Sequence, residues 1–463
     1  MSQNDQKHQI GAAGAAGYRT NRRRLLKGAA VAAGAAMIPS VVRPGHFVAA
    51  ETTLNILAPQ WPQGPKEQAL AAEWAKTSGI GVKFEAVNYA SLEQRIKLLV
   101  ESKSADYDVY DYDSRWIGGF VEAGVFERLD TPEYLGKTGS AVKLTDFFPE
   151  ITGRLVQYPD GESALAAGKP NPNPVYGLPW SLNAEALWYR KDLMDAAPDT
   201  WDALRAKAKE LTKDGMYGYA VQGGRDADWI ISETNPIRWA NGGEIWDSAK
   251  YQAEGILNSA GNVASLQMLV DMVNTDKSID PASANWTINE RLGALLTGKA
   301  AMCLNWAPLF GGVADDPKAS QVVGKIGLAP SPKGSVRRAA MIGCQGTAIN
   351  SASAHKAEAW TYLQWWQSKE TQAAMMADAP SGFLSARQDL RDSAQFEFQK
   401  VFLTMIPDMR DMWNIVEYAQ LLQILQTELS LAYVGKKSAK DALDNAAIAQ
   451  QAVLDGSPRK PKA

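Results

Sequence analysis

Residues 54–113 alternate strand-like and helix-like patterns, and this order restricts the fold more than any other feature of the sequence. Strand patterns occupy residues 54–58, 82–87 and 107–113, and helix patterns occupy 65–76 and a segment that begins at the capping box Ser91–Gln94. Strands and helices that alternate along a chain are typical of a parallel sheet with helices on both faces. The sequence therefore predicts an α/β fold.

The same order predicts where a ligand would bind. Ligands of parallel sheets lie at the C-terminal ends of the strands. Gln60 and Trp61 follow the first strand, and Asp113, Arg115 and Trp116 follow the third. These five residues are the first candidates for a binding site.

Length and composition limit the class of protein. A chain of 463 residues is too long for one ordinary hydrophobic core, so two domains are expected. The hydrophobic content of 46% and charged content of 21% are typical of a globular protein. The net charge is −3 and the body of the chain has no basic stripe, so nucleic acid is not expected as a partner.

Cysteine and histidine are scarce, which argues against several kinds of catalytic and metal sites. The only cysteines are Cys303 and Cys344, and His355 is the only histidine beyond residue 50. A zinc ribbon, a His-based metal site and a Ser–His–Asp triad therefore lack residues, and no cofactor is expected. The two cysteines form either a disulfide or, as we favour, two buried thiols.

Residues 1–50 have the organisation of an export signal. A cluster of arginines at 22–24 precedes a short Ala/Gly-rich apolar run, and Val48-Ala49-Ala50 is a suitable cleavage site. The arginine pair resembles a twin-arginine (Tat) signal, although Asn21 and Leu25 depart from its usual pattern. We expect cleavage near Ala50, export through the Tat machinery and a soluble periplasmic protein. Because this route carries folded cargo, a cofactor enzyme stays among the alternatives.

The segment Val175–Asp192 combines a proline-fixed corner with a β-prone run. Pro179 suits the entry to a strand rather than its middle, and the run Leu187-Trp188-Tyr189 is typical of a strand. Gly-Leu-Pro followed by Leu-Trp-Tyr-Arg-Lys-Asp-Leu resembles the first inter-lobe crossing of the family 1 extracellular solute-binding proteins of ABC importers, the group that includes maltose-binding protein.

Further motifs extend this resemblance over nearly all of the chain after residue 50. They occur in the family's order, at Pro198–Leu204, Gly298–Met302, Ile342–Ile349, Pro380–Phe383 and Lys437–Leu443. The segment Gly293–Ala300 nearly matches a P-loop instead. However, Ala300 replaces the Ser or Thr that would hold Mg²⁺, and the predicted order is helix then strand, which is the reverse of a P-loop.

The resemblance implies a two-lobed periplasmic-binding-protein fold, in which each lobe is a mainly parallel sheet flanked by helices and crossing hinge segments join the lobes. It places the first lobe at residues 51–182 and 349–408 and the second at 183–348 and 409–463. A monomer is expected.

The resemblance also adds cleft residues to the first candidates. They lie at the crossings, at the end of the helix 229–240, at the end of the strand 301–306 and in the Pro380–Phe383 loop, and they are Trp180, Asn183, Trp239, Asn241, Asn305, Trp306, Gly343, Cys344, Gln345 and Gly382. Tryptophan faces suit sugar rings and polar side chains suit hydroxyls. Core packing is the alternative for each Trp, and a helix C-cap is the alternative for Asn241.

The function implied is capture of a sugar or sugar derivative by hinge closure, and its delivery to the permease subunits of an ABC transporter. Arg115 also suits a carboxylate, phosphate or sulfonate, so polyols, oligosaccharides and acidic sugars stay open as ligands. The alternative is a secreted glycoside-active enzyme, a hydrolase or lyase, although no local motif indicates the pair of carboxylates that a hydrolase needs. A cofactor oxidoreductase would need a Gly-rich fingerprint or metal cluster, which the sequence lacks.

Overall fold

The computed structural model describes residues 52–159, 171–225 and 227–461. The predicted signal, its cleavage site near Ala50 and the first mature residue lie outside the described residues. Within the described part of the chain, the helices are all too short or too polar to cross a membrane, and His, Cys, Asp and Glu side chains form no group of three that could hold a metal ion.

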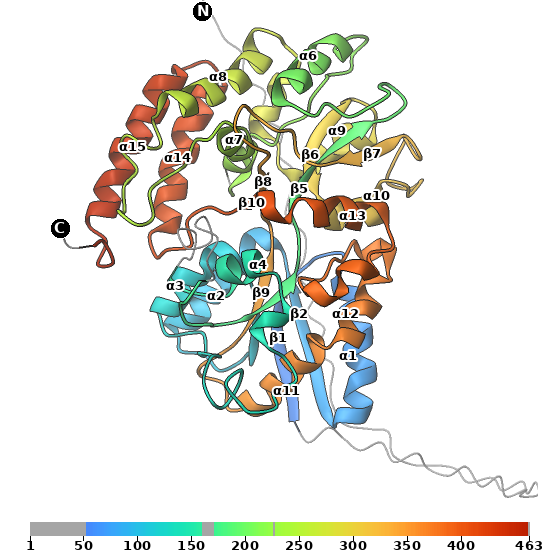
Figure 1. Ribbon diagram of the computed structural model, residues 1–463, viewed down its shortest axis with the longest axis vertical. Helices are drawn as coiled ribbons and strands as arrows, with labels where there is room; N and C mark the ends of the chain where they lie inside the picture. The colour runs from blue at the N-terminus through green and yellow to red at the C-terminus, as the bar shows by residue number, and fades with distance from the viewer. Residues whose placement is uncertain (1–51, 160–170, 226, 462–463) are drawn as a thin grey trace, which may run out of the picture. The chain divides into compact units, whose positions relative to one another are not determined.

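The first lobe is built around a five-stranded sheet with the order β2-β1-β3-β9-β4. Its strands are β1 (Thr52–Pro59), β2 (Ile80–Val87), β3 (Val109–Asp113), β4 (Leu178–Ser181) and β9 (Gln345–Ile349). β1 is parallel to β2 and β3, as the alternating pattern predicts, whereas β9 is antiparallel to both β3 and β4. Figure 1 shows the orange β9 among strands from the N-terminal part of the chain.

Short helices flank this sheet. They are α1 (Gly64–Ser78), α2 (Tyr89–Glu101), α3 (Ile117–Glu122), α4 (Pro149–Leu155), α11 (Lys356–Trp366) and α12 (Lys369–Met376), with 3-10 turns at Ser114–Trp116, Leu144–Asp146, Ala379–Ser381 and Gln388–Ser393. The capping box expected at Ser91 does not start α2, because the helix begins two residues earlier at Tyr89.

The second lobe contains a three-stranded sheet with the order β6-β5-β7. Its strands are β5 (Glu185–Arg190), β6 (Met302–Trp306) and β7 (Ile326–Ala329). Both pairings are antiparallel, which corrects the expectation of a mainly parallel sheet in this lobe. The physical reason is the position of β5: it enters from the crossing and lies between two strands that run the opposite way. The segment 218–222 adds an isolated parallel bridge to β6, between Ala220 and Cys303.

The remaining helices come from the middle and the end of the chain. They are α6 (Trp201–Leu211), α7 (Trp229–Ala240), α8 (Ala260–Asn274), α9 (Ile288–Leu296), α10 (Ala307–Val313), α13 (Glu397–Thr404), α14 (Tyr418–Tyr433) and α15 (Ala439–Asp455), with 3-10 turns at Pro281–Asn285 and Ile406–Asp408. Thr200 caps α6, because its side chain accepts a hydrogen bond from the backbone N–H of Ala203. In Figure 1, the red helices α14 and α15 lie side by side next to α8.

Two crossings connect the lobes, and they lie next to each other. The chain leaves β4 and enters β5 at residues 182–184, where the sequence predicts the first crossing, and the return passes from β8 (Ala340–Met341), paired with β10 (Met409–Arg410), into β9. The backbone N–H of Gly343 donates to the carbonyl of Asn183 at 3.1 Å, which ties the two crossings together. Pro179 is tolerated inside β4 because β4 is an edge strand with a bulge at this point.

Cys303 and Cys344 are both buried free thiols, as we favoured.

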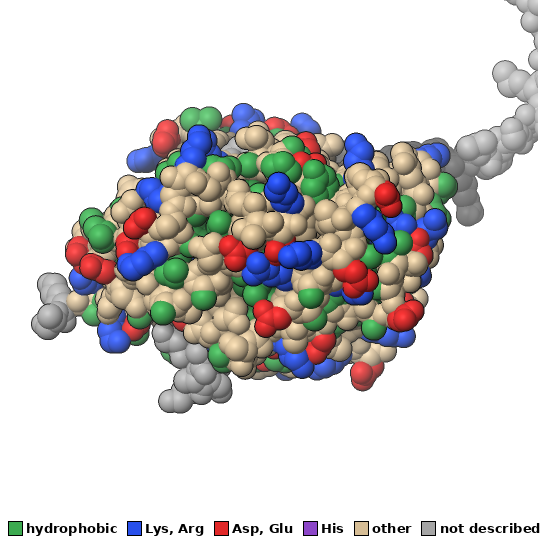
Figure 2. Space-filling model, turned by 90° about the horizontal axis from the view of Figure 1, so that it is seen from above, with side chains coloured by type: hydrophobic (Ala, Val, Ile, Leu, Met, Phe, Trp, Pro, Cys, Tyr) green, Lys and Arg blue, Asp and Glu red, His purple; other side chains and the backbone are tan. Residues whose placement is uncertain are grey.

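On the face shown in Figure 2, basic and acidic side chains are interspersed over the described surface.

Candidate ligand-binding site

A cavity lies where the strand ends of the two lobes meet. Its volume is about 50 Å³, which is room for roughly four water molecules. Its walls come from the loop after β1, the end of β3, both crossings, the N-terminal ends of α7 and α9, and the region after β6. The lining residues are Trp61, Gln63, Tyr89, Asp113, Arg115, Asn183, Asp228, Trp229, Ile288, Trp306, Leu309, Gly343 and Gln345.

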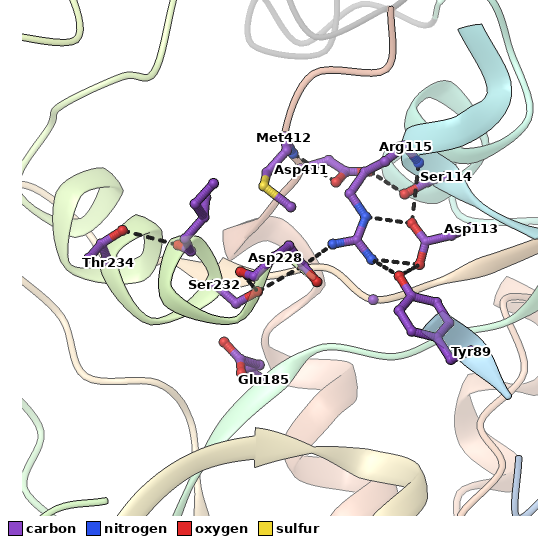
Figure 3. Close-up of polar contacts among 12 residues, drawn as sticks. Tyr89, Asp113, Ser114, Arg115, Glu185, Asp228, Ser232, Thr234, Asp411 and Met412 are labelled. Carbon is purple, nitrogen blue, oxygen red and sulfur yellow. Dashed lines mark hydrogen bonds and ion pairs between the residues drawn. The ribbon is translucent and has the colours of Figure 1, made fainter. Parts of the chain in front are cut away.

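Arg115 lies at the centre of the polar contacts in this cavity (Figure 3). Its Nε donates to Oδ1 of Asp113 at 2.5 Å, and its Nη2 donates to Oδ2 of Asp113 at 2.6 Å and to the hydroxyl of Tyr89 at 2.7 Å. Asp113 also caps the 3-10 turn that carries Arg115, by accepting the backbone N–H of Arg115. The turn and the bidentate pair therefore fix the direction of the guanidinium.

Asp228 completes the cluster from the second lobe. Its Oδ2 accepts a hydrogen bond from Nη1 of Arg115 and another from the hydroxyl of Ser232, one turn further along α7. The three charged side chains are 2–5% exposed. The Arg115–Asp228 ion pair therefore spans the two lobes in a nearly dry environment.

Aromatic rings form much of the remaining wall. The rings of Trp61 and Tyr89 lie 5.4 Å apart between centroids, and Trp229 and Trp306 line the side of the second lobe. Two buried polar atoms of this wall, Nε1 of Trp61 and Oε1 of Gln63, have no hydrogen-bond partner among the described residues. A buried donor and a buried acceptor without partners are costly unless a ligand or water satisfies them.

The cavity brings together several residues that the sequence nominates. Seven of those candidates line it: Trp61, Asp113, Arg115, Asn183, Trp306, Gly343 and Gln345. They come from the strand ends of both lobes and from the two crossings.

Four candidates of the first lobe and the crossings lie elsewhere. Gln60 points to solvent, and Trp116 stacks behind Tyr89 at 5.6 Å without lining the cavity. Trp180 is buried in the first lobe, where its Nε1 donates to Glu67 at 3.2 Å. Gly382 takes a φ of 65° at the end of a 3-10 turn. Trp116 and Trp180 therefore pack against other residues, and Gly382 meets a requirement of backbone geometry.

The other four candidates also have structural contacts in place of cavity contacts. Trp239 is in the hydrophobic core, and Asn241 ends α7 and hydrogen-bonds Ser265 and Ser335. Asn305 is fully buried and accepts from Arg291, and the thiol of Cys344 contacts the backbone of Asn183.

Six lining residues were missed by sequence reasoning: Gln63, Tyr89, Asp228, Trp229, Ile288 and Leu309. Gln63 and Tyr89 follow β1 and β2, so the strand-end rule could have found them. Asp228 and Trp229 begin the helix that the resemblance directs to the cleft. We expected its C-terminal end there, but its N-terminal end lines the cavity. Ile288 and Leu309 carry no comparable signal.

A second buried polar cluster lies within the second lobe. Arg291 donates to the carboxylates of both Glu185 and Glu233, and all three side chains are fully buried. Burial raises the pKa of Glu185 to about 8, against the opposing effect of Arg291. These residues do not line the cavity and are part of the framework that supports it.

Comparison with known proteins identifies a family and similar folds. The model of the family described as bacterial extracellular solute-binding protein matches residues 58–373. A probable amino-acid ABC transporter periplasmic-binding protein of Sinorhizobium fredii is 25% identical over 308 residues, which span 65% of this chain and 65% of that protein.

Solved structures match over most of the chain. A solute-binding protein of an ABC transporter from Agrobacterium radiobacter in complex with ribitol is 25% identical, with a TM-score of 0.72 over 88% of this chain and 99% of that one. The maltose-bound MalE3 of T. maritima is 21% identical, with a TM-score of 0.73 over 87% and 100% of the two chains. These structures confirm the predicted two-lobed α/β fold.

Proposed function

The chain belongs to the family of bacterial extracellular solute-binding proteins, and we propose that it captures a sugar or sugar derivative in the inter-lobe cavity and delivers it to an ABC transporter. The ribitol complex of a similar protein supports a polyhydroxylated ligand. The family is one of binding proteins, in agreement with the prediction that the chain is not an enzyme.

One observation carries the proposed ligand class. The cavity combines aromatic rings with an indole N–H and an amide oxygen that lack partners among the described residues. A ring or carbon chain with hydroxyl groups can pack its C–H face on the aromatic side chains. The same ligand can donate to the amide oxygen and accept from the indole, because a hydroxyl does both.

The size of the cavity supports hinge closure. Its volume of about 50 Å³ is too small to hold a sugar, so we propose that the lobes separate to bind and to release the ligand. We propose that they rotate about the paired crossings at residues 182–184 and 342–344. The lobes are then 51–182 with the segment that begins at 349, and 183–348 with the C-terminal helices. Because α13 packs on α10 and β7, we propose that the last passage between lobes precedes residue 397 rather than following 408.

The cellular setting of the proposal comes from the sequence. Residues 1–50 would direct export through the Tat machinery, with cleavage near Ala50, and the mature chain would act as a monomer in the periplasm. Its partners would be the permease subunits of an ABC transporter and one small ligand.

A binding screen on the chain from Glu51 onwards tests the proposal. The panel contains mono- and oligosaccharides, polyols, sugar acids and, because of the relative's name, amino acids. A ligand that binds only the folded state stabilises it by about 4 kcal/mol at a thousandfold excess over Kd. We expect a clear rise in melting temperature with at least one sugar or polyol, which is recovered unchanged. A shift with amino acids alone, or turnover of the sugar, would contradict the proposed function.

A further inference from the structure

We propose that the cavity selects uncharged polyhydroxy ligands and rejects acidic sugars, and that Asp228 determines this selectivity by occupying Arg115. The inference rests on the proposed function and narrows its ligand class. It also reverses one expectation from the sequence, in which the guanidinium of Arg115 suits an anionic group.

Arg115 has little capacity left for an anion. A guanidinium has five N–H donors. Two of them bind Asp113, a third binds Tyr89 and a fourth binds Asp228. A carboxylate or phosphate normally binds arginine through two parallel N–H bonds, and such a pair of donors is not free here. An acidic ligand would have to displace an aspartate of the protein.

The charge of the cavity also opposes an anion. Among the described residues that line it, Arg115 is the one cation, whereas Asp113 and Asp228 are two carboxylates. The cluster therefore carries a net charge of −1. Its side chains are almost fully buried, and charges repel more strongly in a dry environment than in water. A carboxylate on the ligand would add a second negative charge without a partner.

A hydroxyl group meets no such obstacle. Arg115 and Ser232 both donate to Oδ2 of Asp228, so Oδ1 can accept a hydrogen bond from the ligand. Trp61 Nε1 can donate to a second hydroxyl, and Oε1 of Gln63 can accept a third. An uncharged polyol therefore uses the groups that the ion-pair cluster leaves available.

Matched pairs of alcohol and acid test the selectivity. The probes are ribitol and ribonate, glucitol and gluconate, and glucose and glucuronate, measured by isothermal titration calorimetry on the chain from Glu51. We expect the uncharged member of any pair that binds to have a Kd at least tenfold lower than the acid. An acid that binds as tightly as its alcohol would overturn the inference and leave the proposed function intact. If no pair binds and no sugar of the wider panel raises the melting temperature, the proposed function is wrong, and the inference is wrong with it.

Substitutions test the role of Asp228. Asp228→Asn removes one negative charge and weakens the hydrogen bond to Arg115. The preference for the uncharged ligand, measured as the ratio of the two Kd values, should therefore shrink at least fivefold. Asp276→Asn is the matched control, because Asp276 is a largely buried partner of Arg205 and does not line the cavity; it should leave the preference unchanged. An unchanged preference in Asp228→Asn would refute the role of this residue. If that variant does not fold, Asp113→Asn tests the same charge balance, with the same expected loss of preference.

Discussion

Trp61 carries a buried indole N–H that has no acceptor among the described residues. Replacing Trp61 with Phe keeps an aromatic wall but removes this donor. We expect the loss of one hydrogen bond to the ligand, worth about 0.5–1.5 kcal/mol, to weaken binding roughly two- to tenfold. Titration calorimetry with the ligand found in the screen measures the change.

The control for this variant is Trp365→Phe. Trp365 stacks on Trp74 at 5.0 Å, and neither ring lines the cavity, so this change should leave ligand affinity unaltered. Equal affinities for Trp61→Phe and the unmodified chain would show that the indole N–H does not contact the ligand.

Asp111 is a buried carboxyl that makes stability depend on pH. Burial raises its pKa to about 7, although the hydroxyl of Thr347 donates to it at 2.7 Å. Because the pKa of Asp111 is higher in the folded state, its carboxyl contributes fully to stability below the ordinary pKa of about 4. This contribution is lost as the pH rises to about 7. This contribution is at most about 4 kcal/mol, at about 1.4 kcal/mol for each pKa unit.

Asp111→Asn should therefore reduce the fall in unfolding free energy between pH 4 and pH 7. Part of the fall should persist, because burial and the charge of Asp111 both raise the pKa of Glu67. Urea unfolding at a series of pH values measures it. In the control Asp192→Asn, the partner Arg190 lowers the pKa of Asp192, so its titration lies below this range. Parallel curves for Asp111→Asn and the unmodified chain would refute the prediction.

The tryptophans show the limit of prediction for single residues. Trp61 and Trp306 line the cavity, whereas Trp180 and Trp239 are buried in the lobes. All four lie at or just beyond the end of a strand or helix, where sequence periodicity gives no direction for the ring. Asp113 and Arg115, which the strand-end rule nominates, do line the cavity, because a short strand fixes where the next residues lie.

At the level of elements, periodicity predicted most helices and strands well. α7 has the bounds expected from the sequence, and β6 lies within one residue of the expected limits. The sequence did not indicate which end of α7 faces the cavity, because Trp occurs at both ends. It also did not predict the direction of β5, which depends on the crossing that delivers it to the second sheet.

The second crossing is tightly packed at Gly343. A Cβ added there would lie only 2.7 Å from Cε3 of Trp306 and closer still to Cζ3 of the same ring. Gly343→Ala should therefore push the Trp306 ring from its place in the cavity wall. We expect at least tenfold weaker ligand binding, together with a loss of about 1–3 kcal/mol of stability from overpacking. Calorimetry and urea unfolding measure the two effects.

Gly346→Ala, in β9 just beyond the second crossing, separates packing from binding. Its Cβ would meet the hydroxyl of Tyr112 at 2.6 Å, within the core of the first lobe. This variant should lose stability similarly but retain its affinity. If Gly343→Ala retained its affinity too, the position of Trp306 would not matter for the ligand.

Over the whole molecule, the ion pair in the cavity is not the only tie between lobes. The side-chain amide of Asn414 donates to the carbonyl of Arg154 at 3.2 Å. After α15, Arg459 pairs with Glu122 of α3, and its guanidinium lies over the ring of Tyr158 at 5.0 Å. The C-terminal tail of the second lobe therefore contacts the first lobe through residues that do not line the cavity.

If ligand release requires the lobes to separate, the contacts of Arg459 have to break before the ligand leaves. The ion pair is partly exposed, and such a pair with a cation–π contact contributes about 1 kcal/mol. Arg459→Ala should therefore raise the dissociation rate roughly two- to tenfold and leave the association rate nearly unchanged, in stopped-flow measurements of tryptophan fluorescence. Lys460→Ala is the control, because Lys460 pairs with Asp455 of its own lobe, and its dissociation rate should stay the same. If the dissociation rate of Arg459→Ala also stayed the same, the tail would not restrain opening, and the contacts around Arg115 and the crossings would have to hold the closed state.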